Sequence, residues 1–497
     1  MRDEDGRAAT DAGEGGMMDY QTYRAFLARK SQEGADHGFE PLWMPDSMFD
    51  FQADLTTWAI RKGRAMLNED TGLGKSLQEL VWARNVVMQT GKPVLILTPL
   101  AVARQMVSEA QKFDIEAYLA RDGIASRGIN VTNYERLHLF DWRDFGGVVC
   151  DESSILKSYA GQRRKEITRF MAKVPYRLLA TATAAPNDWV ELGTSSEALG
   201  ELTHTEMLKR FFAQKDDKGQ KLEQRRQDEA ERLIAHDPSY YQKLSYRVSQ
   251  SIGQWRLKHH AVDGFWRWVA SWARACRLPS DLGYEDGDYI LPPLNEQDHV
   301  IASATPPDGF LFTMPAFGFQ EEREERRRTL SERCEYAAQL VDHDRPAVIW
   351  CQMNAEGDLL ESLIPDAAQI AGRTPDERKI ELYDAFAAGE QRVIIIKPKI
   401  GAWGLNWQHC NHVVTFATHS FEQYYQSARR CWRYGQTKPV QLDVIATEGE
   451  ARVLANMRAK GQRAEQMFKR MVEAMHSAER IAPSNLYTQP VEVPEWL

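Results

Sequence analysis

The stretch Glu69-Asp70-Thr71-Gly72-Leu73-Gly74-Lys75-Ser76 decides the predicted fold. The preceding residues 63–67 predict a short buried strand, and residues 77–83 have the apolar spacing of a helix. A turn ending in Gly-x-Gly-Lys-Ser between strand and helix is a phosphate cradle, because glycine lets the backbone approach phosphate and the helix start favours negative charge. An ordinary glycine-rich turn is the alternative, since Glu69 stands where the strict pattern has glycine.

The polar residues of this loop suit a nucleoside triphosphate. Lys75 can reach the β- and γ-phosphates, and the Ser76 hydroxyl can ligate magnesium. About twenty residues upstream, Phe51 can stack on an adenine ring, and the Gln52 amide can both donate to and accept from the adenine edge. We therefore predict ATP and Mg²⁺ as cofactors. The predicted nucleotide contacts are Phe51, Gln52, Thr71, Gly72, Leu73, Gly74, Lys75 and Ser76.

Composition limits the class of protein. A length of 497 residues predicts two to four domains, and 43% hydrophobic with 27% charged residues is typical of globular protein. The net charge of −9 argues against a uniformly positive surface, although a local basic groove is enough to bind nucleic acid. Without a run of 18 apolar residues, no membrane span is expected, and six scattered cysteines indicate reduced thiols in a cytoplasm.

Polar residues follow a series of buried strands. Apolar runs at 94–99, 129–135, 147–152 and 177–183 alternate with helical stretches, which predicts an α/β domain with a parallel sheet. Ligands of such sheets lie beyond the carboxyl ends of the strands, where these runs place their polar residues. A second unit of this kind has predicted strands at 347–351, 391–396 and 412–416.

The region between the two units has a different pattern. Helical stretches at 207–214 and 220–234 lead to a tryptophan-rich helix at 265–272. Its tryptophans could form a core or a base-stacking platform, and a core is favoured. Residues 321–328 mix both signs of charge and predict a solvated helix face.

Taken in order, these elements resemble the superfamily-two helicases and translocases, closest to the Swi/Snf-like branch, with phage-encoded members as the nearest match. The resemblance covers roughly residues 39–460. In this family the leading glycine of the phosphate loop is often absent, which accounts for Glu69. The matching motifs are Phe51-Gln52, residues 70–76, Asp151-Glu152, Thr181-Ala182-Thr183, residues 401–406, and Gln426 with Arg430, Arg433, Gly435 and Gln436.

The resemblance implies an α/β fold of two RecA-like parallel-sheet lobes in tandem with a helical insertion between them. The expected organisation is an N-terminal tail and helix at 1–38, a first ATP-binding lobe at 39–200 and a tryptophan-rich insertion and linker at 201–295. A second, helicase C-terminal lobe is expected at 296–447, and a C-terminal helix and tail at 448–497.

The resemblance also implies roles for individual residues. Asp151 holds the magnesium ion, and Glu152 orients and deprotonates the attacking water. Arg430 and Arg433 act on the γ-phosphate from the second lobe, and Lys75 acts from the first. Gln426 joins the nucleotide contacts, and Thr181 with Thr183 couples hydrolysis to movement. DNA-backbone contacts are expected from Thr98, Asn133, Tyr134, Gly401 and Asn406.

Three departures from the family pattern stand out. Ser154 replaces an acid or histidine, and Ala402 with Trp403 replaces smaller residues of the fifth motif. Arg429 stands where glycine is usual and, on a helix, would point about 100° away from Arg430. We therefore expect Arg429 to contribute little to hydrolysis and consider that it faces nucleic acid.

The predicted function is an ATP-dependent DNA translocase or helicase with little sequence preference. An RNA helicase is one alternative, and an ATP-gated module that loads partners onto DNA and barely moves is another. The predicted partner is duplex or single-stranded DNA, with replication, recombination or packaging proteins as further candidates. The predicted location is cytoplasmic, in a host cell if the protein is phage-encoded.

Overall fold

The structure, a computed structural model, describes residues 36–100, 102–157, 161–185, 188–214, 255–302, 319–401 and 405–480. The expected N-terminal tail and nearly all of its helix, the stretch 220–234, the C-terminal tail, and Ala402 with Trp403 lie outside these ranges. Within them, no helix is both long and apolar enough to cross a membrane. The six cysteines are free and buried.

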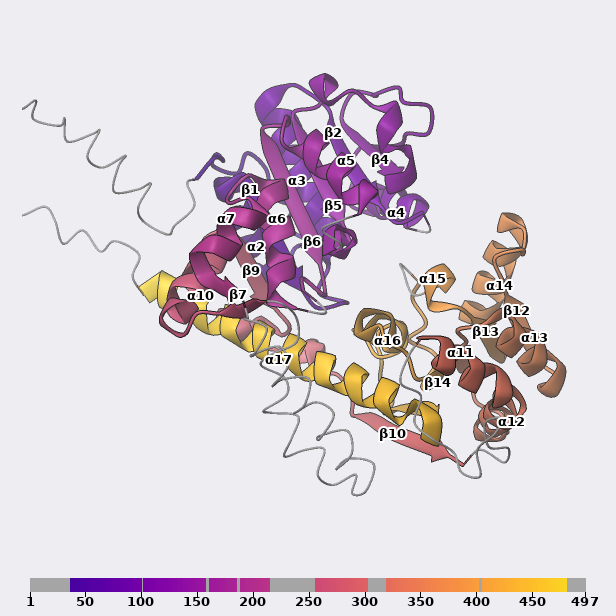
Figure 1. The fold of residues 1–497 in the computed structure, drawn as a ribbon. Helices are drawn as coiled ribbons and strands as arrows, with labels where there is room; N and C mark the ends of the chain where they lie inside the picture. The colour runs from indigo at the N-terminus through magenta and orange to yellow at the C-terminus, as the bar shows by residue number, and fades with distance from the viewer. Residues whose placement is uncertain are drawn as a thin grey trace, which may run out of the picture.

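The first lobe is built on a seven-stranded parallel sheet in the order β3-β4-β2-β5-β6-β1-β9 (Figure 1). This order places β1 and β5, the strands before the phosphate loop and the Asp-Glu pair, on either side of β6. Their carboxyl ends therefore meet at one edge. The strands are β1 (Arg64–Glu69), β2 (Val94–Thr98), β3 (Ala117–Leu119), β4 (Ile129–Asn133), β5 (Gly147–Asp151), β6 (Tyr176–Thr181) and β9 (Ala273–Cys276).

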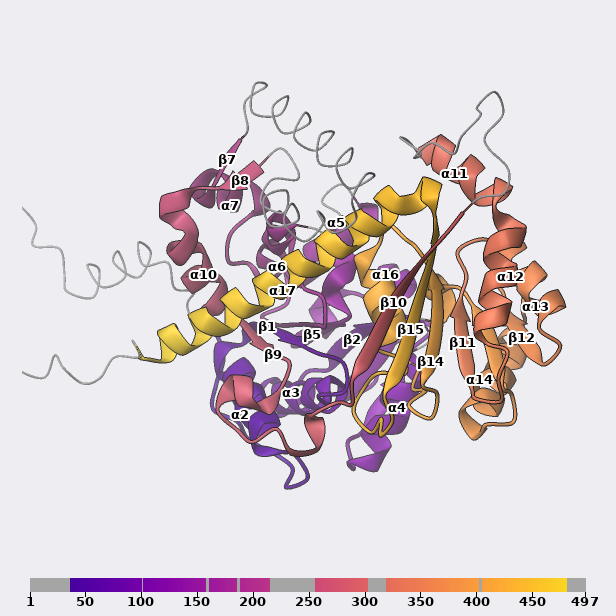
Figure 2. The same ribbon diagram turned by 90° about the horizontal axis from the view of Figure 1, so that it is seen from below.

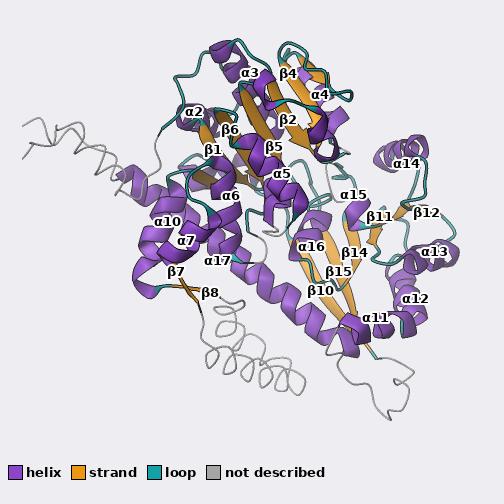
Figure 3. Ribbon diagram, turned by 45° about the horizontal axis from the view of Figure 1, so that its top comes forward, coloured by secondary structure: helices purple, strands orange, loops and turns teal. Residues whose placement is uncertain are grey.

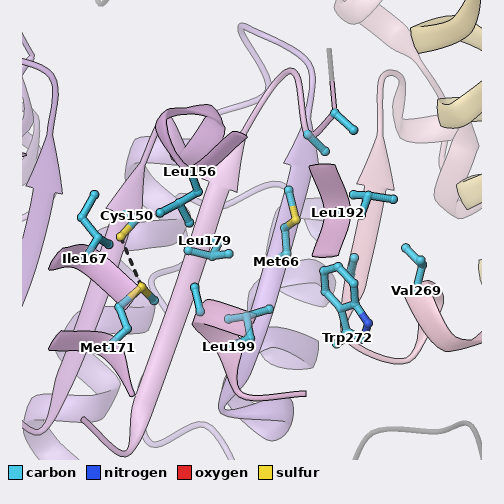
Figure 4. Close-up of a cluster of buried hydrophobic side chains, with 14 of the residues drawn as sticks. Met66, Cys150, Leu156, Ile167, Met171, Leu179, Leu192, Leu199, Val269 and Trp272 are labelled. Carbon is cyan, nitrogen blue, oxygen red and sulfur yellow. Dashed lines mark hydrogen bonds between the residues drawn. The ribbon is translucent and has the colours of Figure 1, made fainter. Parts of the chain in front are cut away.

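Helices cover both faces of this sheet, so both faces are buried. Successive side chains of a strand point to opposite faces and therefore enter different cores. Met66 and Cys150 belong to the core on the face shown in Figure 4, whereas Leu67 and Val149 belong to the core on the other face. The covering helices are α2 (Asp50–Lys62), α3 (Lys75–Thr90), α4 (Ala103–Lys112), α5 (Gln162–Met171), α6 (Leu192–Leu199), α7 (His204–Phe211) and α10 (Val262–Ala270).

The second lobe repeats the design with a six-stranded parallel sheet in the order β10-β15-β14-β11-β13-β12 (Figure 3). Val348 faces one core and Ile349 the other. Its strands are β10 (Leu294–Ile301), β11 (Ala347–Trp350), β12 (Ala367–Ile370), β13 (Val393–Ile396), β14 (His412–Phe416) and β15 (Val440–Thr447). Its helices are α11 (Phe319–Arg328), α12 (Leu330–Leu340), α13 (Asn354–Leu363), α14 (Asp376–Ala388), α15 (Pro398–Gly401) and α16 (Phe421–Ala428). The predicted fold class, two RecA-like lobes in tandem, is confirmed.

The segment between the lobes differs from the expected insertion. Its strand β9 pairs with β1 in the first sheet, so this sheet continues well past residue 200. A short antiparallel pair, β7 (Phe212–Gln214) with β8 (Trp255–Leu257), lies beside it. The tryptophans of α10 and the turn after it are buried in the first-lobe core, as favoured from the sequence: Trp266, Trp268 and Trp272.

The last helix, α17 (Ala451–Arg480), runs along both lobes (Figure 2). It contacts α16 and β15 of the second lobe and α10 and β9 of the first. In α11 the expected solvated face is wrong for Glu322 and Glu325, which are buried. Glu325 accepts a hydrogen bond from Thr447 at 2.7 Å, which compensates its burial.

Candidate active site

The predicted phosphate loop lies between β1 and α3. Gly72 and Gly74 have φ angles of 94° and 86°, a left-handed conformation that L side chains rarely adopt. The Lys75 Nζ donates to the carbonyl oxygens of Glu69 and Asp70, both at 2.8 Å. These contacts fold the lysine back over its own loop, beside the first amides of α3.

The two residues expected to read adenine have structural partners. Phe51 is only 3% exposed and lies in the core, so its ring is not free to stack on a base. The Gln52 amide donates to the Leu73 carbonyl at 2.7 Å, and its Oε1 accepts from the Phe49 amide. Gln52 therefore braces the phosphate loop. The exposed ring here is Phe49, and Tyr289 packs edge-on against both phenylalanines.

Asp151 and Glu152 end β5 at the same edge as the loop. Glu152 has a φ of 56°, one of two positive values at non-glycine residues in the described chain, and such strain is typical of functional sites. The Thr181 hydroxyl donates to Glu152 Oε1 at 2.8 Å, and the Thr183 amide donates to the Thr181 hydroxyl at 3.1 Å. Of the two proposed coupling residues, Thr181 thus contacts the acid directly and Thr183 is connected to it through Thr181. Ser154 makes only a long contact, 3.5 Å, to the same oxygen.

Burial dominates the electrostatics of this edge. It raises the pKa of Asp151 to about 7, and the charge of Glu152 adds to the rise. Burial also raises the pKa of Glu152, and the charges of Lys75 and Arg430 oppose this rise. Both carboxyl groups therefore lie where a cation would favour their charged forms.

Sequence reasoning missed two further acids in this cluster. Glu69 and Glu79 are both buried, and Glu79 has no hydrogen-bond partner for either oxygen among the described residues. Burial and the charge of Asp151 raise the pKa of Glu79 well above its ordinary value. Its spacing of four from Lys75 on α3 was the available signal, because residues four apart share a helix face.

We predict that Glu69→Gln stabilises the fold at high pH. Burial raises the pKa of Glu69 from 4.5 to about 7, although Lys75 and a hydrogen bond from Gln78 oppose the rise. Because the folded-state pKa is the higher one, ionisation disfavours folding progressively between pH 4.5 and 7. The variant should gain up to about 3 kcal/mol in free energy of unfolding at pH 8 and almost nothing at pH 4.5.

Urea unfolding at both pH values measures this difference. Glu324→Gln, on the exposed side of α11, is the control and should show no pH-dependent change. An equal effect of Glu69→Gln at the two pH values would contradict the role given to ionisation.

Helix α16 brings the second lobe to this edge. Its Gln426 amide lies 3.5 Å from Glu152 Oε1, and Glu422 forms an ion pair with Lys157 of the first lobe. Arg430 is buried and donates to Gln426 Oε1 at 2.8 Å and to the Leu405 carbonyl at 3.1 Å. Burial, together with the charge of the neighbouring arginine, lowers the pKa of Arg430 to about 9. The predicted residues of both lobes are thus brought together.

Arg433 and Arg429 occupy different positions around Arg430. Arg433 donates to the Leu405 carbonyl at 3.2 Å within its own lobe. Arg429, expected to point away from the site, instead crosses to the first lobe and donates to Asp70 at 3.1 Å and to the Thr71 hydroxyl at 2.9 Å. It is 3% exposed, so it presents no surface to nucleic acid. The expectation that Arg429 faces nucleic acid is wrong, because this side chain is directed toward the other lobe; its small contribution to hydrolysis stays a prediction.

The expected DNA contacts are mostly buried. Thr98, Asn133 and Tyr134 have exposed fractions of 0, 8 and 3%, and the Tyr134 hydroxyl donates to the Asp151 carbonyl at 2.6 Å. These side chains stabilise strand ends rather than offering a surface to DNA, which corrects that expectation. Gly401 is also buried, and Asn406 is the exposed member of the set.

One protein-family model matches part of the chain. Residues 332–435 match the model of the helicase conserved C-terminal domain. The match begins within α12 and ends at Gly435, so it includes α16 and the arginines described above. The match therefore falls within the second lobe, where the motif order predicted a helicase C-terminal domain.

Individual proteins are also similar to the chain. A DNA annealing helicase and endonuclease, ZRANB3 of Mus musculus, is 26% identical over 180 residues, 32% of this chain and 17% of that protein's length. The Sulfolobus solfataricus SWI2/SNF2 ATPase core, solved in complex with dsDNA, aligns with a TM-score of 0.38 and 14% identity. That alignment covers 89% of this chain and 98% of the other.

Proposed function

We propose that this chain is a DNA-dependent ATPase of the superfamily-two, Swi/Snf-like type. It hydrolyses ATP between its two lobes and moves along DNA with little sequence preference. The resemblance to phage-encoded members belongs to the same proposal and rests on the order of the motifs. The helicase C-terminal match supports the class, and the similarity to a DNA annealing helicase supports DNA as the partner.

One observation carries the proposal, namely the position of Glu152 between the lobes. Its carboxylate accepts a hydrogen bond from Thr181 of the first lobe, and Gln426 of the second lobe lies 3.5 Å away. Lys75 and Arg430, one from each lobe, both lower its pKa through their charge. An acid held in this way can respond to both lobes at once, as a motor requires.

The residues present fit ATP with a divalent cation. The described chain contains no group of three His, Cys, Asp or Glu side chains that could hold a metal ion alone. Magnesium commonly takes one or two protein ligands and completes its shell with phosphate and water. Ser76 and Asp151 would supply these ligands, and a cation there offsets the burial that raises the pKa of Asp151.

Each residue then has a defined task in phosphoryl transfer. The α3 amides and Lys75 bind the phosphates. To do so, the Lys75 side chain must move away from the carbonyl oxygens of Glu69 and Asp70, to which it donates in the structure. Glu152 orients the attacking water and accepts its proton. Arg430 and Arg433 stabilise charge on the transferred group, since guanidinium forks suit phosphate oxygens. Lobe closure around ATP and reopening after hydrolysis would drive movement.

ATP hydrolysis with and without DNA tests this function. We expect turnover to rise on addition of duplex or single-stranded DNA of unrelated sequences. Stimulation by RNA alone would favour the RNA-helicase alternative, and DNA binding without any stimulated turnover would favour the loading module.

We predict that Arg433→Ala lowers turnover much more than nucleotide affinity. Its charge is needed most in the transition state, so kcat should fall on the order of a hundredfold and KM should change little. Steady-state kinetics measures both quantities. The exposed Arg470 of α17 provides a matched Arg→Ala control, and an equal loss in kcat for the two variants would remove Arg433 from the chemistry.

A further inference from the structure

The phosphate loop is held by a residue of the opposite lobe that the chemistry above does not use. Arg429, the residue that follows α16, forms an ion pair with Asp70, the second residue of the loop stretch. Its Nε lies 3.1 Å from Asp70 Oδ1 and 2.9 Å from the Thr71 hydroxyl. The Tyr425 hydroxyl, one turn earlier on α16, donates to the same carboxylate.

Both charged groups are withdrawn from water, with exposed fractions of 3% for Arg429 and 8% for Asp70. Burial alone would raise the pKa of Asp70, but the charge of Arg429 and the hydrogen bonds from Tyr425 and Arg429 outweigh it, so the pKa lies below its usual value. Asp70 is therefore a charged, buried carboxylate whose compensation comes mainly from the second lobe, with a smaller contribution from the charge of Arg277 in the first lobe. Trp432, with its ring 4.6 Å from the Arg429 guanidinium, helps hold that group in place.

The position of Asp70 makes this compensation matter for nucleotide binding. The backbone carbonyl of Asp70 accepts a hydrogen bond from Lys75, and its carboxylate accepts one from the Thr71 amide at 2.7 Å. Asp70 therefore orders the start of the loop. An unpaired carboxylate beside a site for a triphosphate would repel the incoming charge, and a buried charge without a partner would also distort the loop.

We propose that Arg429 is a positioning residue that keeps the phosphate loop competent for nucleotide by neutralising Asp70 from the opposite lobe. Arg429 acts through Asp70 and does not touch the nucleotide. This inference rests on the proposed ATP-binding function. It adds an ion pair between the lobes that acts on nucleotide binding, before hydrolysis takes place. It also predicts that replacing Asp70 together with Arg429 restores the nucleotide binding that is lost when Arg429 alone is replaced.

Binding of a fluorescent ATP analogue and steady-state kinetics test the inference on four full-length proteins. These are wild type, Arg429→Gln, Asp70→Asn/Arg429→Gln and the surface control Arg470→Ala. Arg429→Gln should weaken analogue affinity and raise KM by about tenfold or more, with kcat changed less than threefold, because the arginine acts on the loop rather than on the transition state. The double variant carries no unpaired charge and should recover affinity to within about threefold of wild type.

The outcomes separate the two proposals. If wild type neither binds the analogue nor hydrolyses ATP, the proposed function fails. If wild type binds it and Arg429→Gln binds equally well, or if the double variant is as weak as Arg429→Gln, the positioning role is refuted. Should Arg429→Gln not fold, as judged by thermal unfolding, Arg429→Lys replaces it. Lysine keeps the positive charge but lacks the two donor groups with which arginine contacts Asp70. The Arg429→Lys protein should therefore bind the ATP analogue three- to tenfold more weakly than wild type, and unchanged binding would refute the positioning role.

Discussion

Lys75→Ala should abolish ATP turnover, lowering kcat/KM by more than about a thousandfold. In the proposed function Lys75 binds the β- and γ-phosphates, and its charge also lowers the pKa of both Asp151 and Glu152. In the structure its ammonium makes two backbone contacts within the loop. Loss of these two hydrogen bonds from a partly exposed ammonium should reduce the free energy of unfolding by about 3 kcal/mol.

Turnover and denaturant unfolding, measured on the same preparations, separate chemistry from folding. Lys112→Ala, at the exposed end of α4, is the matched control and should keep full activity. A Lys75→Ala protein that is folded and turns over ATP normally would remove the phosphate-binding role from this loop.

Glu152→Gln should trap a state that binds ATP and does not hydrolyse it. The amide keeps the size of the side chain, and its oxygen can still accept from Thr181, but it cannot take a proton from water. Turnover should fall by about a thousandfold or more, within the range expected for removal of a general base. Analogue affinity should stay within a few fold of wild type.

Single-turnover hydrolysis and equilibrium binding measure these two quantities. Glu324→Gln controls for the loss of one negative charge at an exposed position. If nucleotide binding disappears while Glu152→Gln remains folded, Glu152 is a binding residue and its assignment as the base is wrong.

The fold was predictable because its signals are local. Apolar runs such as 94–98 and 393–396 are typical of buried parallel strands, and the phosphate loop predicted the order of strand, turn and helix. Strand β9 was missed because its four residues, Ala273–Cys276, are too short and mixed for a period to be visible. Its place beside β1 depends on long-range pairing that sequence spacing does not encode.

The candidate site was predictable in its motif residues and not in the contacts between them. The proximity of Glu152 and Thr181 follows from neighbouring strands ending at one edge. The burial of Thr98 and Tyr134, in contrast, depends on tertiary packing around the strand ends, which sequence spacing does not encode. The contact of Arg429 was not predicted because sequence spacing gives the direction of a helical side chain relative to its neighbours. It does not show which residues of the opposite lobe that side chain meets.

Movement along DNA is the central claim, and triplex displacement measures it most directly. A third strand bound to a duplex is released when a translocase moves through it, without separation of the duplex strands. The account predicts ATP-dependent release by the wild-type protein and none by Glu152→Gln under the same conditions. DNA-stimulated ATP hydrolysis by the wild type with no release of the third strand would contradict it.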